Sequence, residues 1–210
     1  MKTASLDWYF DFVSPFSYLQ SAKLDAFAAH ATLTCRPVLF AGLLQHFGNV
    51  GPAEIEPKRR WTFEHVAWLA HEHGIALKLP PAHPFVPLRL LRLSIVLGNP
   101  VEVVQRLFAF VWRDGQLPTD DDAFGGLLDE YGVALADLDA PQVKQALRTN
   151  TEAAVAAGVF GVPSAVIDGD VFWGFDATPM VLARLRGDPF FASPGLEAAR
   201  NLPQGVQRPR

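Results

Sequence analysis

The chain has 210 residues, of which half are hydrophobic and 19% are charged. This length and composition suit one domain, or one domain with a large insertion, around a substantial core. The formal charge of −4 gives no reason to expect nucleic acid or an anionic membrane as a partner. The single cysteine, Cys35, excludes an intrachain disulfide and a cysteine-based metal site, and we expect it to be a small buried side chain.

The first 40 residues have a β-α-β pattern. Residues 5–13, "SLDWYFDFV", are aromatic and rich in β-formers, which predicts a strand. Residues 15–30 carry apolar side chains at helical spacing, and residues 32–39, "TLTCRPVL", predict a second strand. Two strands joined by a helix are expected to pair in parallel.

The middle of the chain has a helical pattern, with no convincing strand between about 80 and 160. Gly- and Pro-rich loops such as "GNVGPAEIEP" and "KLPPAHPFVP" separate the segments. Helices are predicted at residues 40–47, 61–73, 86–98, 100–113, 120–130 and 140–156, and in part of 132–138.

Strand patterns return near residue 160. Residues 163–167 and 171–173 predict a hairpin, because the Asp168-Gly169 pair between apolar runs is a strong turn signal. A helix is expected next, with Asp176 as its N-cap. The Pro- and Gly-bearing residues after 188 suggest an irregular tail.

Together these elements predict an α/β fold, a thioredoxin-like domain with an inserted all-helical domain. The thioredoxin-like domain is discontinuous, at residues 1–40 and 158–190, the insertion covers 41–157, and 191–210 form a C-terminal tail. The opening residues lead into a strand rather than a secretory signal, and the apolar runs are too short to span a bilayer. A cytoplasmic protein is therefore expected.

Ser14 stands where the first strand turns into a helix, in "SPFS". A helix N-terminus carries unpaired N–H groups and partial positive charge, and so stabilises an anion. Thioredoxin-like proteins hold a cysteine thiolate at this position, whereas Ser14 can only donate a hydrogen bond to a thiolate supplied by another molecule. The simpler interpretation is an ordinary N-cap, with Pro15 at the favoured first helical position.

A second candidate is the Val162-Pro163 pair in "GVFGVPSAV". An apolar residue, a proline and then a strand is the pattern with which thioredoxin-like folds form a cis-proline, and we predict a cis bond here. The main chain of Val162 could then pair with an extended peptide. A proline that merely begins a strand is the alternative.

Other polar residues are weaker candidates. Asn49 and Lys58 lie in a loop and near a helix end, where they could bind the polar ends of a small peptide or simply face solvent. His83 precedes a helix that carries Arg89 and Arg92, which could line a pocket for an aromatic acid or be exposed on an amphipathic helix. The histidines do not form a metal-binding motif, so no metal is expected.

The ordered motifs "YFDFVSPFSYL", "GNVGP", "PKRRW", "GVFGVPSAV" and "WGFDA" resemble those of the 2-hydroxychromene-2-carboxylate isomerases. These enzymes are relatives of the kappa-class glutathione transferases in the DsbA-like branch of the thioredoxin superfamily. The resemblance runs from about residue 6 to 185. It implies reduced glutathione as cofactor, a homodimer, and a small aromatic substrate from a degradation pathway for aromatic compounds.

The resemblance also implies roles for individual residues. Ser14 would be catalytic, because it hydrogen-bonds the glutathione sulfur and favours its thiolate. Asn49, Lys58, Val162, Pro163 and Asp176 would bind glutathione: the first two near its glycyl end, Val162 at its cysteinyl unit and Asp176 at its γ-glutamyl ammonium. Candidates for contacts with the substrate are Phe16, His83 and Arg89.

Two departures from the family pattern affect these expectations. Phe175 and Ala177 flank Asp176, where the family usually has a polar residue and an arginine, which weakens one side of the glutamyl pocket. The loop at His83 also differs from the corresponding loop of the family, so the resemblance does not define which substrate the protein takes. Two alternatives therefore remain: a kappa-like transferase that conjugates glutathione to electrophiles, and a non-catalytic thioredoxin-like binding module.

Overall fold

A four-stranded mixed sheet forms the centre of the molecule in the computed structural model, which describes residues 4–206. The strand order is β2-β1-β3-β4. Strand β1 (Ala4–Phe10) pairs in parallel with β2 (Ala31–Pro37) and antiparallel with β3 (Ser164–Ile167). Strand β4 (Asp170–Trp173) completes the hairpin at the edge. The sequence therefore correctly predicted a thioredoxin-like arrangement.

Strand β1 is buried on both faces, which explains its unbroken aromatic run. Trp8 and Phe10 lie on one face, fully buried, with ring centroids 4.8 Å apart, and both contact Phe108 of the insertion. Tyr9 faces the other side, where it packs with Val38 and Leu43. A central strand covered on both faces brings the end of β1, and with it Ser14, to a fixed position.

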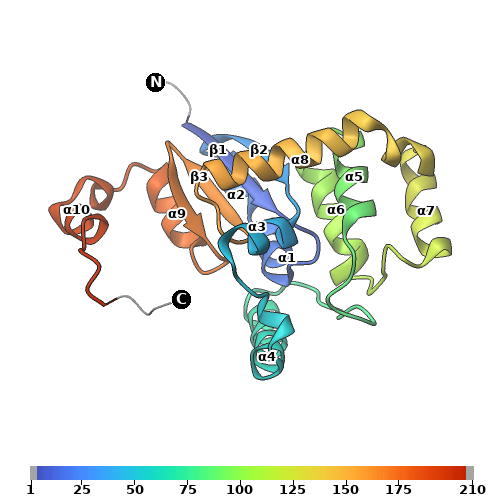
Figure 1. Cartoon of the computed structure of the whole chain (residues 1–210), viewed down its shortest axis with the longest axis horizontal. Helices are drawn as coiled ribbons and strands as arrows, with labels where there is room; N and C mark the ends of the chain where they lie inside the picture. Colours follow the sequence, from blue (N-terminus) through green and yellow to red (C-terminus); the bar gives the residue numbers. More distant parts are fainter. Residues whose placement is uncertain (1–3, 207–210) are drawn as a thin grey trace.

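Helices cover the sheet and extend beyond it, as Figure 1 shows, with α5, α6 and α7 to one side and α9 to the other. The helices are α1 (Pro15–Ser21), α2 (Leu24–Ala28), α3 (Phe40–Phe47), α4 (Glu56–Glu72), α5 (Leu88–Val96), α6 (Val101–Trp112), α7 (Asp121–Tyr131), α8 (Pro141–Ala156), α9 (Thr178–Leu185) and α10 (Pro194–Arg200). Short 3₁₀ turns lie at η1 (Pro52–Glu54), η2 (Leu135–Asp139) and η3 (Pro189–Ala192).

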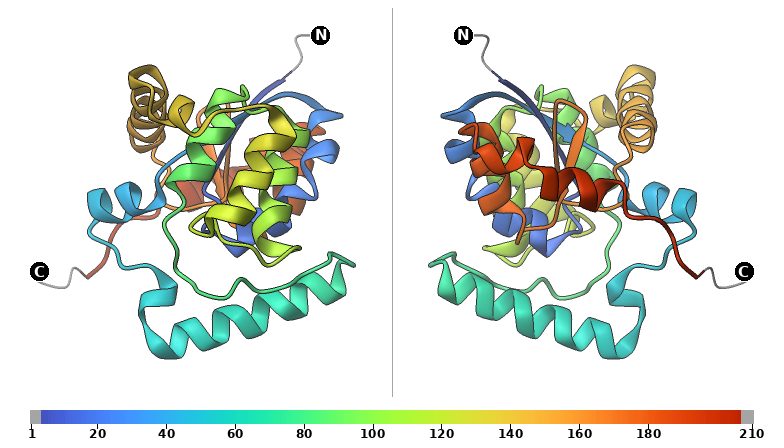
Figure 2. Two further views of the ribbon diagram at one scale, coloured as in Figure 1. Left: turned by 90° about the vertical axis from the view of Figure 1, so that its right-hand side faces the viewer. Right: turned by 90° about the vertical axis from the view of Figure 1, so that its left-hand side faces the viewer.

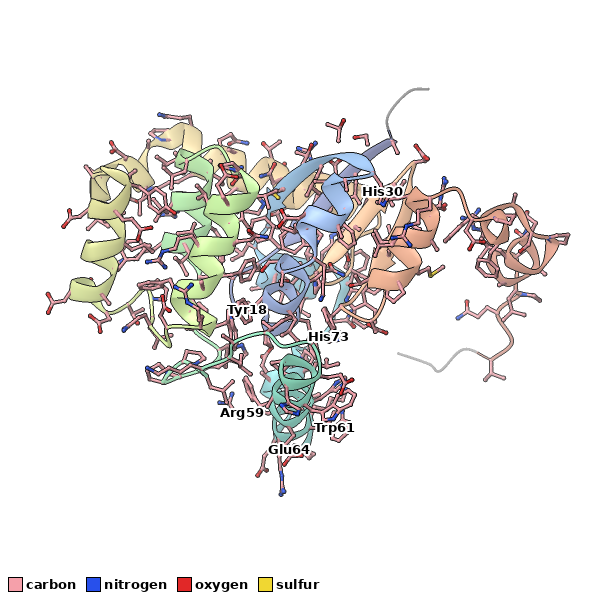
Figure 3. The ribbon with its side chains drawn as sticks, turned by 180° about the vertical axis from the view of Figure 1, so that it is seen from behind. Tyr18, His30, Arg59, Trp61, Glu64 and His73 are labelled. Carbon is pink, nitrogen blue, oxygen red and sulfur yellow. The ribbon has the colours of Figure 1, made fainter. Side chains whose placement is uncertain are left out.

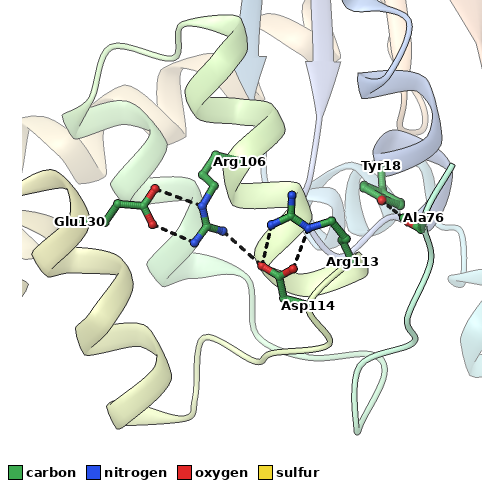
Figure 4. A network of polar contacts seen from close by, with 6 residues as sticks. All are labelled: Tyr18, Ala76, Arg106, Arg113, Asp114 and Glu130. Atoms are coloured by element: carbon green, nitrogen blue, oxygen red, sulfur yellow. Dashed lines mark hydrogen bonds and ion pairs between the residues drawn. The ribbon is translucent and has the colours of Figure 1, made fainter.

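The helical segment between β2 and β3 is held to itself and to helix α1 by polar contacts. Arg106 of α6 binds Glu130 of α7 at 2.8 Å and approaches Asp114 at 3.5 Å (Figure 4). The Tyr18 hydroxyl of α1 donates to the carbonyl of Ala76, just after α4 (Figure 4). Helix α4 forms the lower edge of the ribbon in Figure 2, and its Val66 and Ala70 are buried in the main core. The division into two domains stays a prediction.

Several predicted boundaries were wrong. The expected helix at 15–30 is two helices, because the Lys23 N–H bonds Gln20 O at 2.8 Å and tightens the chain there. The expected helix at 61–73 begins five residues earlier, at Glu56. The tail after 188 was expected to be irregular, but it contains η3 and α10, the latter capped by the Ser193 hydroxyl.

Asp176 is not the N-cap of α9, contrary to the prediction. The N-cap is Ala177, and no side chain caps this helix. The reason is a preceding turn, in which Ala177 N–H bonds Gly174 O at 3.3 Å and Thr178 N–H bonds Phe175 O at 3.1 Å. The Asp176 carboxylate instead lies over Gly174, whose φ of +96° and lack of a side chain permit this approach.

Candidate functional site

Ser14 lies at the N-terminus of α1, as predicted, and is buried at 6% exposure. Its Oγ accepts a hydrogen bond from the Ser17 N–H at 3.2 Å, which makes it the N-cap of the helix. The same hydroxyl donates to the carbonyl of Val162 at 3.3 Å. This second bond is long, and a better acceptor could replace it.

Val162 brings the second predicted motif against the first. The Val162–Pro163 peptide bond is cis, which confirms the prediction. The Pro163 carbonyl pairs with the Gly174 N–H at 2.9 Å, whereas the Val162 N–H has no acceptor among residues 4–206. Val162 therefore offers a main-chain donor that a bound peptide could satisfy.

Two cavities meet at this point, and they share Phe16, Val162 and Trp173 as lining residues. The first, here called the serine cavity, has a volume of about 490 Å³ and is lined by Ser14, Asn49 and His83 among others. The second, the α9 cavity, has a volume of about 760 Å³ and runs along α9 past Asp176. Both fall in the size range of small-molecule sites.

The α9 cavity is bordered by aromatic and imidazole rings. Phe16 lies 6.0 Å from the ring of His65 on α4, and His73 lies 5.1 Å from Phe175, as centroid distances. Figure 3 shows His73 at the part of α4 that faces the rest of the ribbon. Asp176 is exposed at the rim, and no hydrogen bond or ion pair within residues 4–206 engages its carboxylate. It is available to a ligand cation.

Asn49 lies at the rim of the serine cavity because α3 ends directly before it. Gly48 takes the left-handed conformation at φ +64°, and the Asn49 N–H then bonds Leu44 O at 2.9 Å, a typical helix C-terminal motif. The Asn49 side chain is exposed and makes no hydrogen bond within the described part of the chain. Its position fits a ligand contact at the mouth of the cavity.

Three predicted site residues line neither cavity: Lys58, Arg89 and Pro163. Lys58 is exposed in the first turn of α4 and lines neither of them. Arg89 binds the Asp121 carboxylate at 2.6 Å and the Pro118 carbonyl at 2.9 Å, and its guanidinium lies over the ring of Phe124. These bonds hold Arg89 in the helical insertion, away from Ser14.

Asp11 is a site residue that the sequence analysis missed. It lines the serine cavity and is fully buried, and its carboxylate accepts the N–H groups of Val13 at 3.0 Å and Phe40 at 2.9 Å. Burial raises its pKa to about 7, and these hydrogen bonds only partly oppose the shift. A carboxylate inside an otherwise aromatic strand pattern was the signal that could have revealed it.

Gln20 is a second residue that the sequence did not single out. Its amide is fully buried, accepts from Trp8 Nε1 at 2.7 Å, and donates to Gly174 O at 2.9 Å and Thr178 Oγ1 at 3.0 Å. It thereby ties β1 and α1 to the turn that carries Asp176. A glutamine within a helical pattern gives no sequence signal for such a role.

Two further properties concern residues 4–206 as a whole. No group of three or more potential metal-binding side chains comes together there. None of the helices in this part of the chain combines the length and hydropathy needed to cross a bilayer.

Comparison with known proteins identifies the class of protein that this fold and site define. Residues 5–186 match the family model for the DSBA-like thioredoxin domain, so the chain belongs to that family. The chain has a single cysteine, Cys35, so it contains no pair of cysteines that could form a redox dithiol.

Within this family, the chain is similar to 2-hydroxychromene-2-carboxylate isomerases. It is 28% identical to the enzyme of Sphingobium xenophagum, over 83% of this chain and 94% of that protein, and 29% identical to the enzyme of Pseudomonas putida, over 81% and 89%. A solved 2-hydroxychromene-2-carboxylate isomerase superposes with a TM-score of 0.76, at 25% identity, over 89% of this chain and 97% of that one. Human glutathione S-transferase kappa 1 is 26% identical, over 88% and 91%.

Proposed function

We propose that this protein is a glutathione-dependent isomerase of the 2-hydroxychromene-2-carboxylate type. It would convert that compound, or a similar aromatic-pathway substrate, into a trans-o-hydroxybenzylidenepyruvate. The proposal depends most on one observation: the Ser14 hydroxyl, at a helix N-terminus, touches the Val162 carbonyl where the two cavities meet. The names of the relatives support the choice of reaction.

The residues present fit reduced glutathione as the cofactor. The unpaired Val162 N–H and the adjacent carbonyl match the main chain of a cysteinyl unit, which is the short antiparallel pairing of an extended peptide. Asp176, in the α9 cavity, would face the γ-glutamyl ammonium. Asn49, in the serine cavity, would bind the glycyl end. Lys58 would have to reach that end from outside the cavity.

Bound glutathione would supply a thiolate that adds reversibly to the substrate, so that the ring opens and a bond can rotate before the thiol leaves. The protein's part is to favour the ionised sulfur. A hydroxyl donor and the positive end of α1 both stabilise an anion beside Ser14. A decrease of one to two units in the thiol pKa needs about 2 kcal/mol, which these two effects can supply together.

The hydrogen bonds of Ser14 suggest how the hydroxyl becomes available. In the structure the Ser14 proton is directed at the Val162 carbonyl, over the long distance of 3.3 Å. A cysteinyl N–H that pairs with this carbonyl would compete with the hydroxyl for the same acceptor. The hydroxyl could then turn its proton to the sulfur, while the Ser17 N–H continues to hold its oxygen.

A kappa-like transferase is the second candidate function. The kappa-class relatives are 25–26% identical to this chain and the isomerases are 27–29% identical, so sequence identity separates the two classes poorly. The two functions differ in the fate of glutathione: an isomerase regenerates it in each turnover, and a transferase releases it as an adduct.

The decisive experiment follows substrate and free glutathione together in one reaction. The proposed function predicts substrate isomerisation that requires glutathione, with no loss of glutathione over many turnovers. Stoichiometric consumption of glutathione would instead indicate a transferase. A protein that binds glutathione without activating its sulfur, judged by thiolate absorbance, would be a binding module and would contradict both enzyme proposals.

We also propose that the protein is a homodimer, and the family resemblance supports this. Two tryptophans on α4 are largely exposed in the single chain, Trp61 at 64% and Trp68 at 57%. Figure 3 shows Trp61 and Arg59 on opposite sides of this helix. Light scattering on the purified protein measures the oligomeric state, and a monomer at working concentration would contradict this part of the proposal.

A further inference from the structure

The backbone that leads into Ser14 is held by an unusual number of side chains. The Val13 N–H donates to the Asp11 carboxylate at 3.0 Å, and the Val13 carbonyl bonds His83 Nε2 at 2.8 Å. One residue earlier, the Phe12 carbonyl accepts from Trp112 Nε1 at 2.9 Å. One local side chain, Asp11, and two from distant parts of the chain, His83 and Trp112, therefore fix the turn that ends β1.

The contact with Val13 determines the tautomer of His83. A carbonyl oxygen can only accept a hydrogen bond, so Nε2 must carry the proton. Nδ1 is buried and has no partner within residues 4–206. Burial is the main cause that lowers the pKa of His83; the hydrogen bond to Val13 opposes this shift, and the positive charge of Arg59 adds to it.

The ring of His83 is held in place by its neighbours. Phe63 lies 5.1 Å away edge-on, Trp112 lies 5.7 Å away, and Phe85 lies 6.2 Å away, as distances between ring centroids. The backbone carbonyl of His83 accepts a bond from Arg59 of α4. With its ring packed and its backbone held, His83 presents the Nε2–H in one direction.

The Nε2–H group of His83 affects the electrostatic potential at Ser14 through the Val13 carbonyl. The negative end of the Val13 carbonyl lies one residue before the serine, and Val13 lines the serine cavity. An unpaired carbonyl there would raise the energy of a nearby anion, and a donor bonded to it reduces that effect. His83 lines the same cavity, but its Nδ1 is buried, so the ring does not offer this nitrogen to a ligand.

We propose that His83 is a positioning residue for Ser14, which orients the Val13 carbonyl so that the serine site favours a thiolate. This inference deepens the proposed function and rests on it. It differs from the expectation that His83 contacts the substrate, because here His83 acts on the sulfur only through the backbone. The proposal therefore predicts effects on ionisation of the bound thiol rather than on substrate selection.

The test compares three variants of His83. His83→Gln places an amide nitrogen close to the position of Nε2 and should keep the bond to Val13. The side chain in His83→Asn is one methylene shorter than that of glutamine, so it should lose the hydrogen bond to the Val13 carbonyl while it keeps a polar amide. His83→Leu removes the donor. If His83→Leu fails to fold, the comparison of Gln with Asn still decides the question.

The main measurement is the thiolate absorbance of bound glutathione as a function of pH. Asn and Leu should reduce the thiolate fraction near neutral pH about fivefold, the effect of one ordinary hydrogen bond, and kcat should fall by a similar factor. Gln should restore most of both values. The dissociation constant for glutathione should change less than twofold. Nitrogen NMR of the protein without glutathione should show His83 in the Nε2–H tautomer.

The outcomes separate the two proposals. If the wild-type protein neither binds glutathione nor ionises it, the proposed function is wrong and this inference is wrong with it. If the wild-type protein ionises glutathione and all three variants do so equally well, only the role of His83 is overturned. An equal loss in Gln, Asn and Leu would also overturn it, because such a loss would indicate packing rather than the donor to Val13.

Discussion

The two ends of the proposed glutathione site differ in how the protein holds them. At the sulfur end, Ser14 and Val162 are buried and bonded to each other. At the outer ends, Asn49, Lys58 and Asp176 are exposed, and none has a side-chain hydrogen bond within residues 4–206. Under the proposed function, the chemistry would thus depend on a fixed centre, whereas the affinity for glutathione would depend on side chains that can adjust to the ligand.

The largest effect is expected at the fixed centre. Ser14→Ala should lower turnover about 10²-fold or more, because it removes the only side-chain donor proposed for the sulfur. Steady-state kinetics with saturating glutathione measure this. The loss of the N-cap should cost about 1 kcal/mol of stability, which denaturant unfolding measures separately.

Ser21→Ala is the matched control for Ser14. Ser21 is buried on the same helix, and its hydroxyl bonds Tyr18 O at 2.6 Å, but it lines neither cavity. Turnover of this control should stay within twofold of wild type. Equal losses in the two variants would indicate a general disturbance of α1, and unchanged turnover in Ser14→Ala would overturn the role of the serine.

The connection between the two ends is tested at Gln20. Gln20→Leu leaves the buried Trp8 Nε1 without an acceptor and removes one hydrogen bond each from Gly174 O and Thr178 Oγ1, and it should destabilise the protein by about 3 kcal/mol. Gln105→Leu removes a glutamine with one bond, to Ser21 O at 2.9 Å, and should cost about 1 kcal/mol. Similar unfolding free energies for the two variants would contradict the importance of the buried network.

The pH dependence of the fixed centre follows from Asp11. Its pKa is raised by burial from 3.8 to about 7, so the folded state binds more protons than the unfolded state between these values. The unfolding free energy that Asp11 contributes should therefore fall as pH rises from about 4 to 7, and stay level above that.

Asp11→Asn removes this dependence. The comparison is made by denaturant unfolding of both proteins across this pH range, and the difference between the two curves isolates Asp11 from His83, whose lowered pKa acts in the opposite sense. A difference that does not change with pH would show that Asp11 does not titrate in this range.

The smallest effect is expected at the adjustable rim. Asp176→Asn should weaken glutathione binding by up to about fivefold, the usual worth of an exposed ion pair, and should leave kcat nearly unchanged. Titration calorimetry measures the affinity. Asp122→Asn, on the exposed first turn of α7, is the control for a lost negative charge. A large fall in kcat for Asp176→Asn would mean that the rim also takes part in the chemistry.

The same contrast explains what could be predicted from the sequence. The β-α-β start, the hairpin at Asp168-Gly169 and the Val162–Pro163 junction have local signals, and the structure confirms them. The break near Lys23 and the turn before α9 were missed, because bonds such as Lys23 N–H to Gln20 O compete with a continuous helix only in the folded chain.

The residues of the candidate site also divide into those that have a local sequence signal and those that do not. Ser14 was found because a serine followed by proline marks a helix start, and Val162 was found because the pattern around Pro163 is thioredoxin-like. The hydrogen bond between the two residues is seen only in the structure. Asp11 and Gln20 were missed, because their partners are 29 and 158 residues away in the chain. Arg89 was selected as a substrate candidate, although its partner Asp121 lies in another helix that no local pattern connects to it.

The bond between Ser14 and Val162 has a consequence for the stability of the protein. Since the hydroxyl already has an acceptor in the isolated chain, the buried oxygen of Ser14 is satisfied before any ligand binds. The Val162 N–H beside it has no acceptor within residues 4–206, so a bound peptide would complete the site. Under the proposed function, abundant tripeptide would therefore speed the reaction and also add to the stability of the enzyme by mass action.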